Sequence, residues 1–155
     1  MKITIIGGGN IGGAIAGGLA ASTLMKASDL TVADPSAAAL ERIKGLNSAI
    51  RTSQDNAAAV EGADLIILAV KPWLAEEVSA TFRDKLNFDR QCLASVVAGV
   101  SFEKLKTMLD NGKDVRPALL RLIPNTAISL RESVTFIASD GASESQLNAV
   151  VTLFK

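Results

Sequence analysis

The stretch Ile3-Thr4-Ile5-Ile6-Gly7-Gly8-Gly9-Asn10-Ile11-Gly12 (residues 3–12) decides the fold. Its apolar beginning predicts a buried strand over Lys2–Ile6. After the glycines, Ile11, Ile15 and Leu19 recur at a spacing of four residues, which predicts a helix over Asn10–Ser22 with one apolar face. The sequence therefore predicts a strand, a glycine-rich turn and a helix in immediate succession.

The glycines of this turn fit the pattern GxGxxG, with Gly7, Gly9 and Gly12 at its three glycine positions. A strand before the pattern and a helix after it are the context in which it indicates dinucleotide binding. The first glycine allows a tight turn, the second lets the backbone approach a pyrophosphate, and the third lets the helix pack on the strand. The N-terminus of the helix then offers N–H groups to the phosphates. The alternative is a glycine-rich turn that binds nothing.

The rest of the chain alternates short apolar runs with helical patterns. This alternation predicts an α/β fold, a Rossmann-type, doubly wound and mostly parallel sheet with helices on both faces, in one domain over residues 1–155. The expected strands are Leu30–Ala33, Ser48–Thr52, Leu65–Val70, Cys92–Val97, Leu119–Ile123 and Ser133–Ala138. The expected helices are Ala37–Lys44, Asn56–Glu61, Leu74–Arg83, Phe102–Leu109 and a last one that starts at a capping box, Ser143-x-x-Gln146.

Composition excludes several classes of function. Sixteen Lys and Arg balance sixteen Asp and Glu, His is absent, and Cys92 is the one cysteine. No histidine catalysis, metal site or disulfide framework is therefore expected, and a neutral chain with 4% aromatic residues is not typical of nucleic-acid binding. The uncharged run Ile3–Met25 is long enough for a membrane span or a signal peptide, but three glycines and Asn10 would interrupt its helix. We expect a cytoplasmic protein without a membrane or nucleic-acid partner.

Asp34 directly follows the second predicted strand and lies 22 residues after Gly12, about where an acid binds the adenosine ribose hydroxyls. Such an acid disfavours the 2′-phosphate of NADP by repulsion. Three alternatives stay open: Asp34 caps a helix that begins at Pro35, Ser36 donates to a 2′-phosphate, or Arg42 or Arg51 supplies a positive charge.

The ends of the later strands hold further candidates, because ligands of open α/β sheets bind beyond the carboxyl ends of the strands. Lys71 either lies near a phosphate or is a solvated residue at a helix start. The Asn125-Thr126 pair after Pro124 predicts a substrate-side loop or, equally, an Asx turn. Trp73, at an exposed helix start, and Cys92, in a strand, are expected to be packing residues.

Four stretches resemble pyrroline-5-carboxylate reductase, the last enzyme of proline biosynthesis, and the likeness covers essentially the whole chain. Its most specific parts are the motifs AVKP, AGVS and PNT at their separations. The matching stretches are Ile5–Leu19, Asp55–Pro72, Ser95–Leu105 and Arg121–Ser139.

The resemblance implies an oxidoreductase that reduces 1-pyrroline-5-carboxylate to L-proline by hydride transfer from NAD(P)H, with this chain as its cofactor-binding domain. Residues near the pyrophosphate would be Gly7, Gly9, Asn10, Ile11 and Gly12, and those near the adenosine ribose Asp34, Ser36 and Asn56. Residues that line the ribose and nicotinamide would be Ala69, Val70, Lys71, Pro72, Ala98 and Gly99, and the substrate side would hold Pro124, Asn125 and Thr126.

The resemblance also implies a second, helical domain after Lys155 that forms dimers and supplies much of the substrate pocket. Without it, no catalytic residue is assigned in this chain, which we expect to be inactive alone, and the full-length protein would be a homo-oligomer built from dimers. The resemblance favours NADP(H), whereas Asp34 and Pro35 leave NAD(H) open. Alternatives are a non-catalytic, stand-alone NAD(P)-binding module, a β-hydroxyacid dehydrogenase or a deazaflavin-linked NADP reductase.

Overall fold

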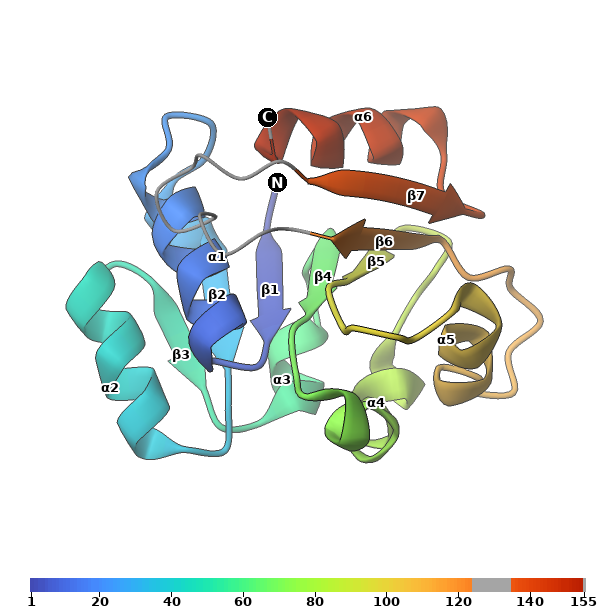
Figure 1. Ribbon diagram of the computed structural model, residues 1–155, viewed down its shortest axis with the longest axis horizontal. Helices are drawn as coiled ribbons and strands as arrows, with labels where there is room; N and C mark the ends of the chain where they lie inside the picture. The colour runs from blue at the N-terminus through green and yellow to red at the C-terminus, as the bar shows by residue number, and fades with distance from the viewer. Residues whose placement is uncertain (124–134, 155) are drawn as a thin grey trace.

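The computed structural model describes residues 1–123 and 135–154, which form one seven-stranded sheet with helices packed on it (Figure 1). The strands are β1 (Ile3–Ile6), β2 (Leu30–Ala33), β3 (Arg51–Ser53), β4 (Leu65–Leu68), β5 (Cys92–Ser95), β6 (Leu119–Ile123) and β7 (Phe136–Asp140). The α-helices are α1 (Asn10–Ala21), α2 (Ala37–Leu46), α3 (Asn56–Val60), α4 (Ala75–Phe82), α5 (Phe102–Met108) and α6 (Glu144–Leu153). Three short 3₁₀ turns are η1 (Ala27–Asp29), η2 (Pro72–Leu74) and η3 (Arg83–Lys85).

The strand order is β3-β2-β1-β4-β5-β6-β7, so the first strand lies inside the sheet between β2 and β4. Every pair is parallel except β6 with β7. All residues of β1, β4 and β5 are buried, because helices cover both faces of these strands. The predicted mostly parallel, doubly wound sheet is confirmed.

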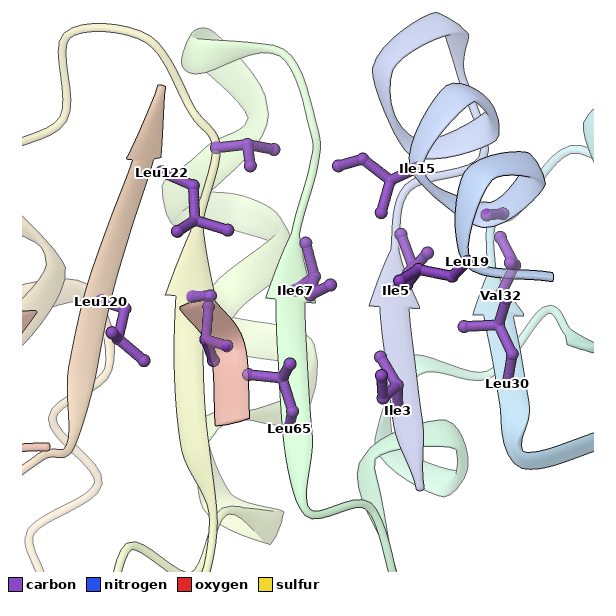
Figure 2. Packing of buried hydrophobic residues seen from close by; sticks show 14 of the residues in the cluster. Ile3, Ile5, Ile15, Leu19, Leu30, Val32, Leu65, Ile67, Leu120 and Leu122 are labelled. Atoms are coloured by element: carbon purple, nitrogen blue, oxygen red, sulfur yellow. The ribbon is translucent and has the colours of Figure 1, made fainter. Parts of the chain in front are cut away.

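One face of the sheet is covered by α1, α2 and α6. Figure 2 shows Ile15 and Leu19 of α1 beside Ile5 and Val32 of the strands. The opposite face packs against α3, α4 and α5, with Phe82 as its largest fully buried side chain. Two separate apolar cores therefore hold the sheet in place and fix its carboxyl edge.

The last helix starts as predicted. Ser143 Oγ accepts a hydrogen bond of 3.1 Å from the N–H of Gln146, and Gln146 Oε1 accepts one of 2.9 Å from the N–H of Ser143. The expected last strand begins later than predicted, at Phe136, and runs to Asp140; Ser133 and Val134 lie outside the described residues.

Ile11 shares a helix face with Ile15 and Leu19 but is 49% exposed, because the first turn of α1 lies beyond the ends of the strands. Trp73 is 76% exposed at the helix start η2, so its expected role as a packing residue is wrong, whereas Cys92 is buried as expected. None of the helices within residues 1–123 and 135–154 is long and apolar enough to cross a membrane.

Candidate dinucleotide-binding site

Gly7 turns the chain sharply at the end of β1. Its φ angle is +109°, and a Cβ atom there would overlap the carbonyl oxygen of Ala69, just after β4. On the other side, its N–H donates a hydrogen bond of 2.8 Å to the carbonyl of Ala33 at the end of β2. The turn is therefore wedged between two neighbouring strand ends, where L side chains do not fit.

Gly12 allows α1 to approach this turn. A Cβ atom at Gly12 would overlap the carbonyl oxygen of Gly7. The close approach directs the start of α1 at the edge where β1, β2 and β4 end. The structural role predicted for the third glycine of the motif, close packing of helix and strand, thus corresponds to a contact in the structure.

Gly9 differs from its neighbours, because a Cβ atom there would have no heavy atom within 4 Å. Gly9 is the N-cap of α1 and supplies no side-chain cap. The first helical bond runs from the N–H of Gly13 to the carbonyl of Gly9, at 2.7 Å, so the N–H groups of Asn10, Ile11 and Gly12 have no partner within the helix. An open space in front of free N–H groups at a helix N-terminus fits the phosphates of a dinucleotide.

A cavity opens in front of this turn. Its wall brings together most of the residues predicted at the end of β1, β2 and β4, and adds apolar ones from η2 and α4. The lining residues are Ile6, Gly7, Gly9, Asn10, Ile11, Ala33, Asp34, Pro35, Asn56, Ala69, Val70, Lys71, Leu74 and Val78.

Other predicted residues do not line this cavity. Ser36 caps α2, Pro72 begins η2, and Ala98 and Gly99 form an exposed turn after β5. Gly12 acts through its contact with Gly7. Pro124, Asn125 and Thr126 lie outside the described residues. For all of these, a role in binding stays a prediction.

Sequence reasoning missed Leu74 and Val78, which close the cavity from η2 and α4. Leu74 and Val78 are four residues apart and follow Pro72, which was a signal that their side chains share one face of the helix start. The exposed Trp73 lies beside Leu74 in the sequence, next to the cavity wall.

The carboxylate of Asp34 is held by two backbone donors. Oδ2 accepts a hydrogen bond of 2.8 Å from the N–H of Gly8, and Oδ1 accepts one of 2.8 Å from the N–H of Ser36. The alternative in which Asp34 caps a helix starting at Pro35 is wrong. The helix α2 begins at Ala37, and its cap is Ser36, whose Oγ accepts from the N–H of Ala39 at 3.1 Å.

Two other polar residues lie at the same edge of the sheet. Asn56 starts α3 and donates from Nδ2 to Thr81 Oγ1 of α4 at 3.0 Å. Lys71 is exposed and follows β4, while Asp34 follows β2 on the other side of β1. Within the described ranges, no group of three or more His, Cys, Asp or Glu side chains is arranged to hold a metal ion.

A protein-family comparison agrees with this geometry. The family described as "NADP oxidoreductase coenzyme F420-dependent" matches residues 2–99, which include the glycine turn, β4 and β5. The chain belongs to this family of NADP oxidoreductases. Membership confirms the expected class of protein and supports a nicotinamide dinucleotide as the cofactor.

Individual relatives point to the reductase that the sequence resembles. The chain is 33% identical to a pyrroline-5-carboxylate reductase of Pasteurella multocida over 136 residues, which are 86% of this chain and 47% of the relative. The solved pyrroline-5-carboxylate reductase of Coxiella burnetii has a TM-score of 0.88 and 27% identity, over 99% of this chain and 55% of that one.

A third relative is similar in fold. A Plasmodium falciparum pyrroline carboxylate reductase, solved with NADP bound, gives a TM-score of 0.84 at 22% identity and covers 99% of this chain and 54% of that one. The chain thus spans about half the length of the curated relatives it matches.

Proposed function

We propose that this chain is the cofactor-binding domain of a reductase that converts 1-pyrroline-5-carboxylate to L-proline with NAD(P)H. The observation that carries the cofactor part is the open cradle at Gly9, which faces free N–H groups at the start of α1. The substrate part is supported by similarity to pyrroline-5-carboxylate reductases across most of the chain.

Different residues of the cavity would contact different parts of the cofactor. Gly7, Gly9 and the first N–H groups of α1 would hold the pyrophosphate, and Asp34 with Asn56 would lie at the adenosine ribose. Ala69, Val70 and Lys71, at the end of β4, would line the other half of the cofactor. We extend the proposal to residues for which the resemblance implies a role near the same cofactor and the substrate: Ser36, Pro72, Ala98, Gly99 and the loop Pro124–Thr126.

The chemistry asks little proton transfer of these residues. A bound nicotinamide would supply the hydride for the carbon of the C=N bond, while the nitrogen takes a proton. The residues of this chain would hold the cofactor in the one orientation in which its hydride can reach the substrate. We assign no proton donor within the chain, and we propose that turnover needs a second domain, that the whole enzyme is a homo-oligomer of dimers, and that it lies in the cytoplasm.

Binding is tested first. Trp73 is the one tryptophan of the chain and lies next to the cavity wall, so a bound reduced nicotinamide should quench its emission by energy transfer. We expect saturable quenching by NADH, NADPH or both, and calorimetry of the same titration should give matching affinities. Absence of any signal with both cofactors, in either method, would contradict the proposal.

Activity is tested separately. The complete protein that carries this domain should oxidise NAD(P)H in the presence of 1-pyrroline-5-carboxylate and form proline, detected by mass spectrometry. We expect the 155-residue chain alone to bind cofactor without turnover. Full turnover by the chain alone would refute the need for a second domain, and cofactor binding without proline formation by the complete protein would favour a non-catalytic NAD(P)-binding module.

A further inference from the structure

The charge distribution of the cavity points to one of the two nicotinamide cofactors. NADH and NADPH differ by the phosphate on the 2′-oxygen of the adenosine ribose. The end of β2 is the part of a doubly wound fold that meets this ribose. In this chain the residues there that line the cavity are Ala33, Asp34 and Pro35.

The negative charge of Asp34 is fixed at this point. Its two carboxylate oxygens accept hydrogen bonds of 2.8 Å each, from the N–H groups of Gly8 and Ser36. Rotation of the side chain would leave both N–H groups without this acceptor. The loop is held from the other side as well, since Gln54 Nε2 donates to the carbonyl of Pro35 at 2.8 Å.

The fixed carboxylate can still bind a ribose. Each carboxylate oxygen has about two acceptor positions, and one is used in each case. The remaining positions suit a pair of neighbouring hydroxyl groups, which donate hydrogen bonds. A 2′-phosphate replaces one of those donors by a doubly charged acceptor.

The positive charge that could compensate a 2′-phosphate does not lie next to Asp34. Among the residues that the structure shows lining the cavity, Lys71 is the one cation. Lys71 follows β4, and Asp34 follows β2, with β1 between these strands. Two strand spacings put the two backbone positions about 10 Å apart.

The other candidates for a phosphate contact lie outside the cavity wall. Ser36 does not line the cavity: its N–H donates to Asp34 and its Oγ accepts from Ala39, which leaves its O–H as its one remaining donor. Arg42, in the middle of α2, and Arg51, at the start of β3, are exposed and do not line the cavity. This placement does not support the alternatives in which an arginine neutralises a 2′-phosphate.

We propose that Asp34 makes this site selective for NADH over NADPH. The inference rests on the proposed cofactor site and adds the residue that selects between its two ligands. Repulsion between a fixed carboxylate and a phosphate at the rim of a cavity corresponds to a preference of about tenfold or more in dissociation constant.

The test compares both cofactors on the same protein by calorimetry, at low and at high salt. The wild-type chain should bind NADH at least about tenfold more tightly than NADPH at low salt, and the ratio should shrink at high salt because the repulsion is screened. Tighter or equal binding of NADPH would overturn the inference while leaving the cofactor site intact. Failure of both cofactors to bind would instead refute the proposed function.

Two variants isolate the charge. Asp34→Asn keeps the size of the side chain and one carbonyl acceptor, and should bring the NADPH to NADH ratio close to one. Pro35→Arg leaves Asp34 in place, adds a cation on the same loop, and should strengthen NADPH binding several-fold without strengthening NADH equally. Asp89→Asn, an exposed residue in the loop before β5, removes one charge at the opposite edge of the sheet and should leave the ratio unchanged.

The proposal stays testable even if one of these variants does not fold. If Asp34→Asn loses its circular dichroism spectrum because the tether to Gly8 is needed, Pro35→Arg decides the question. A folded Asp34→Asn with the wild-type ratio would show that Asp34 does not set the preference. A Pro35→Arg without improved NADPH binding would show that the 2′-phosphate does not lie beside this loop, which would also overturn the proposal.

Discussion

A Cβ atom on Gly12 would occupy the space of the Gly7 carbonyl oxygen, so the start of α1 and the turn after β1 can share their positions only while residue 12 has no side chain. We therefore expect Gly12→Ala to lower the free energy of unfolding by about 1–3 kcal/mol, as overpacked sites do. Urea unfolding followed by circular dichroism measures this. Gly17→Ala, in the same helix, is the control: its nearest heavy atom is Leu46 Cδ1 at 3.7 Å, and we expect a gain of about 0.5–1 kcal/mol.

Gly9→Ala should separate binding from stability. The added methyl group meets no atom of the protein and projects into the space proposed for the pyrophosphate. We expect the free energy of unfolding to fall by about 1 kcal/mol or less, because Ala is a poorer N-cap than Gly, and NADH binding to weaken about tenfold. Gly45→Ala in α2, equally open, should leave binding unchanged. Undiminished affinity in Gly9→Ala would place the pyrophosphate elsewhere.

Cys92 should be inert in the folded protein. Burial, and to a smaller extent the nearby carboxylate of Asp64, raises the pKa of its thiol from 9.0 to about 11. At pH 8 the thiolate is therefore about 100-fold scarcer than in the unfolded chain, and reaction with a thiol reagent should be slower by at least that factor. Stopped-flow labelling with and without urea measures the ratio; rapid labelling of the native protein would contradict the burial of this strand.

The same pKa shift makes stability depend on alkaline pH. Because the folded pKa is the higher one, the contribution of Cys92 is complete below pH 9 and is lost as the pH rises through 9 towards 11. Cys92→Ala should remove this part of the alkaline decline, although the variant will be less stable at pH 7 because it leaves a small cavity. Thermal melts between pH 7 and 11 compare the slopes; equal slopes would assign the decline to other groups.

Asp140 ties the antiparallel edge strand β7 to its neighbours. Hydrogen bonds from Lys106 and Arg116, at 2.8 and 3.0 Å, lower the pKa of its carboxyl below the ordinary value. The stabilisation is therefore present at neutral pH and is lost as the pH falls below about 4. Asp140→Asn should lower the melting temperature at pH 7 but not in acid. Glu103→Gln, which removes a more exposed partner of Lys106 at 3.5 Å, should have little effect at either pH.

Local patterns predicted most of the fold because each element has one consistent signal. The predicted strand Leu65–Val70 contains β4, since both faces of β4 are buried, and Ser143 caps the helix for which it was proposed. Periodicity placed Ile11 on the same helix face as Ile15 and Leu19, but Ile11 lies beyond the strand ends and is exposed. Only the positions of the strands in space reveal that Ile11 borders a cavity.

The site was predictable where a single turn forms it and less so where separate elements meet. The residues of the glycine motif are close together in the sequence, so their spacing alone predicted the tight turn at Gly7 and the close packing at Gly12. The two hydrogen bonds of Asp34 join residues 8, 34 and 36, and depend on the pairing of β1 with β2. The spacing of Leu74 and Val78 indicates a shared helix face, but only the positions of η2 and α4 in the fold show that this face closes the cavity.

The interior position of β1 has a consequence for synthesis on the ribosome. β1 pairs on one side with Leu30–Ala33 and on the other with Leu65–Leu68. One of its edges therefore stays unpaired until β4 has also been translated, and this apolar edge is exposed to chaperones during that interval. Slowing translation between β2 and β4 should therefore lengthen the time for which this aggregation-prone edge is accessible.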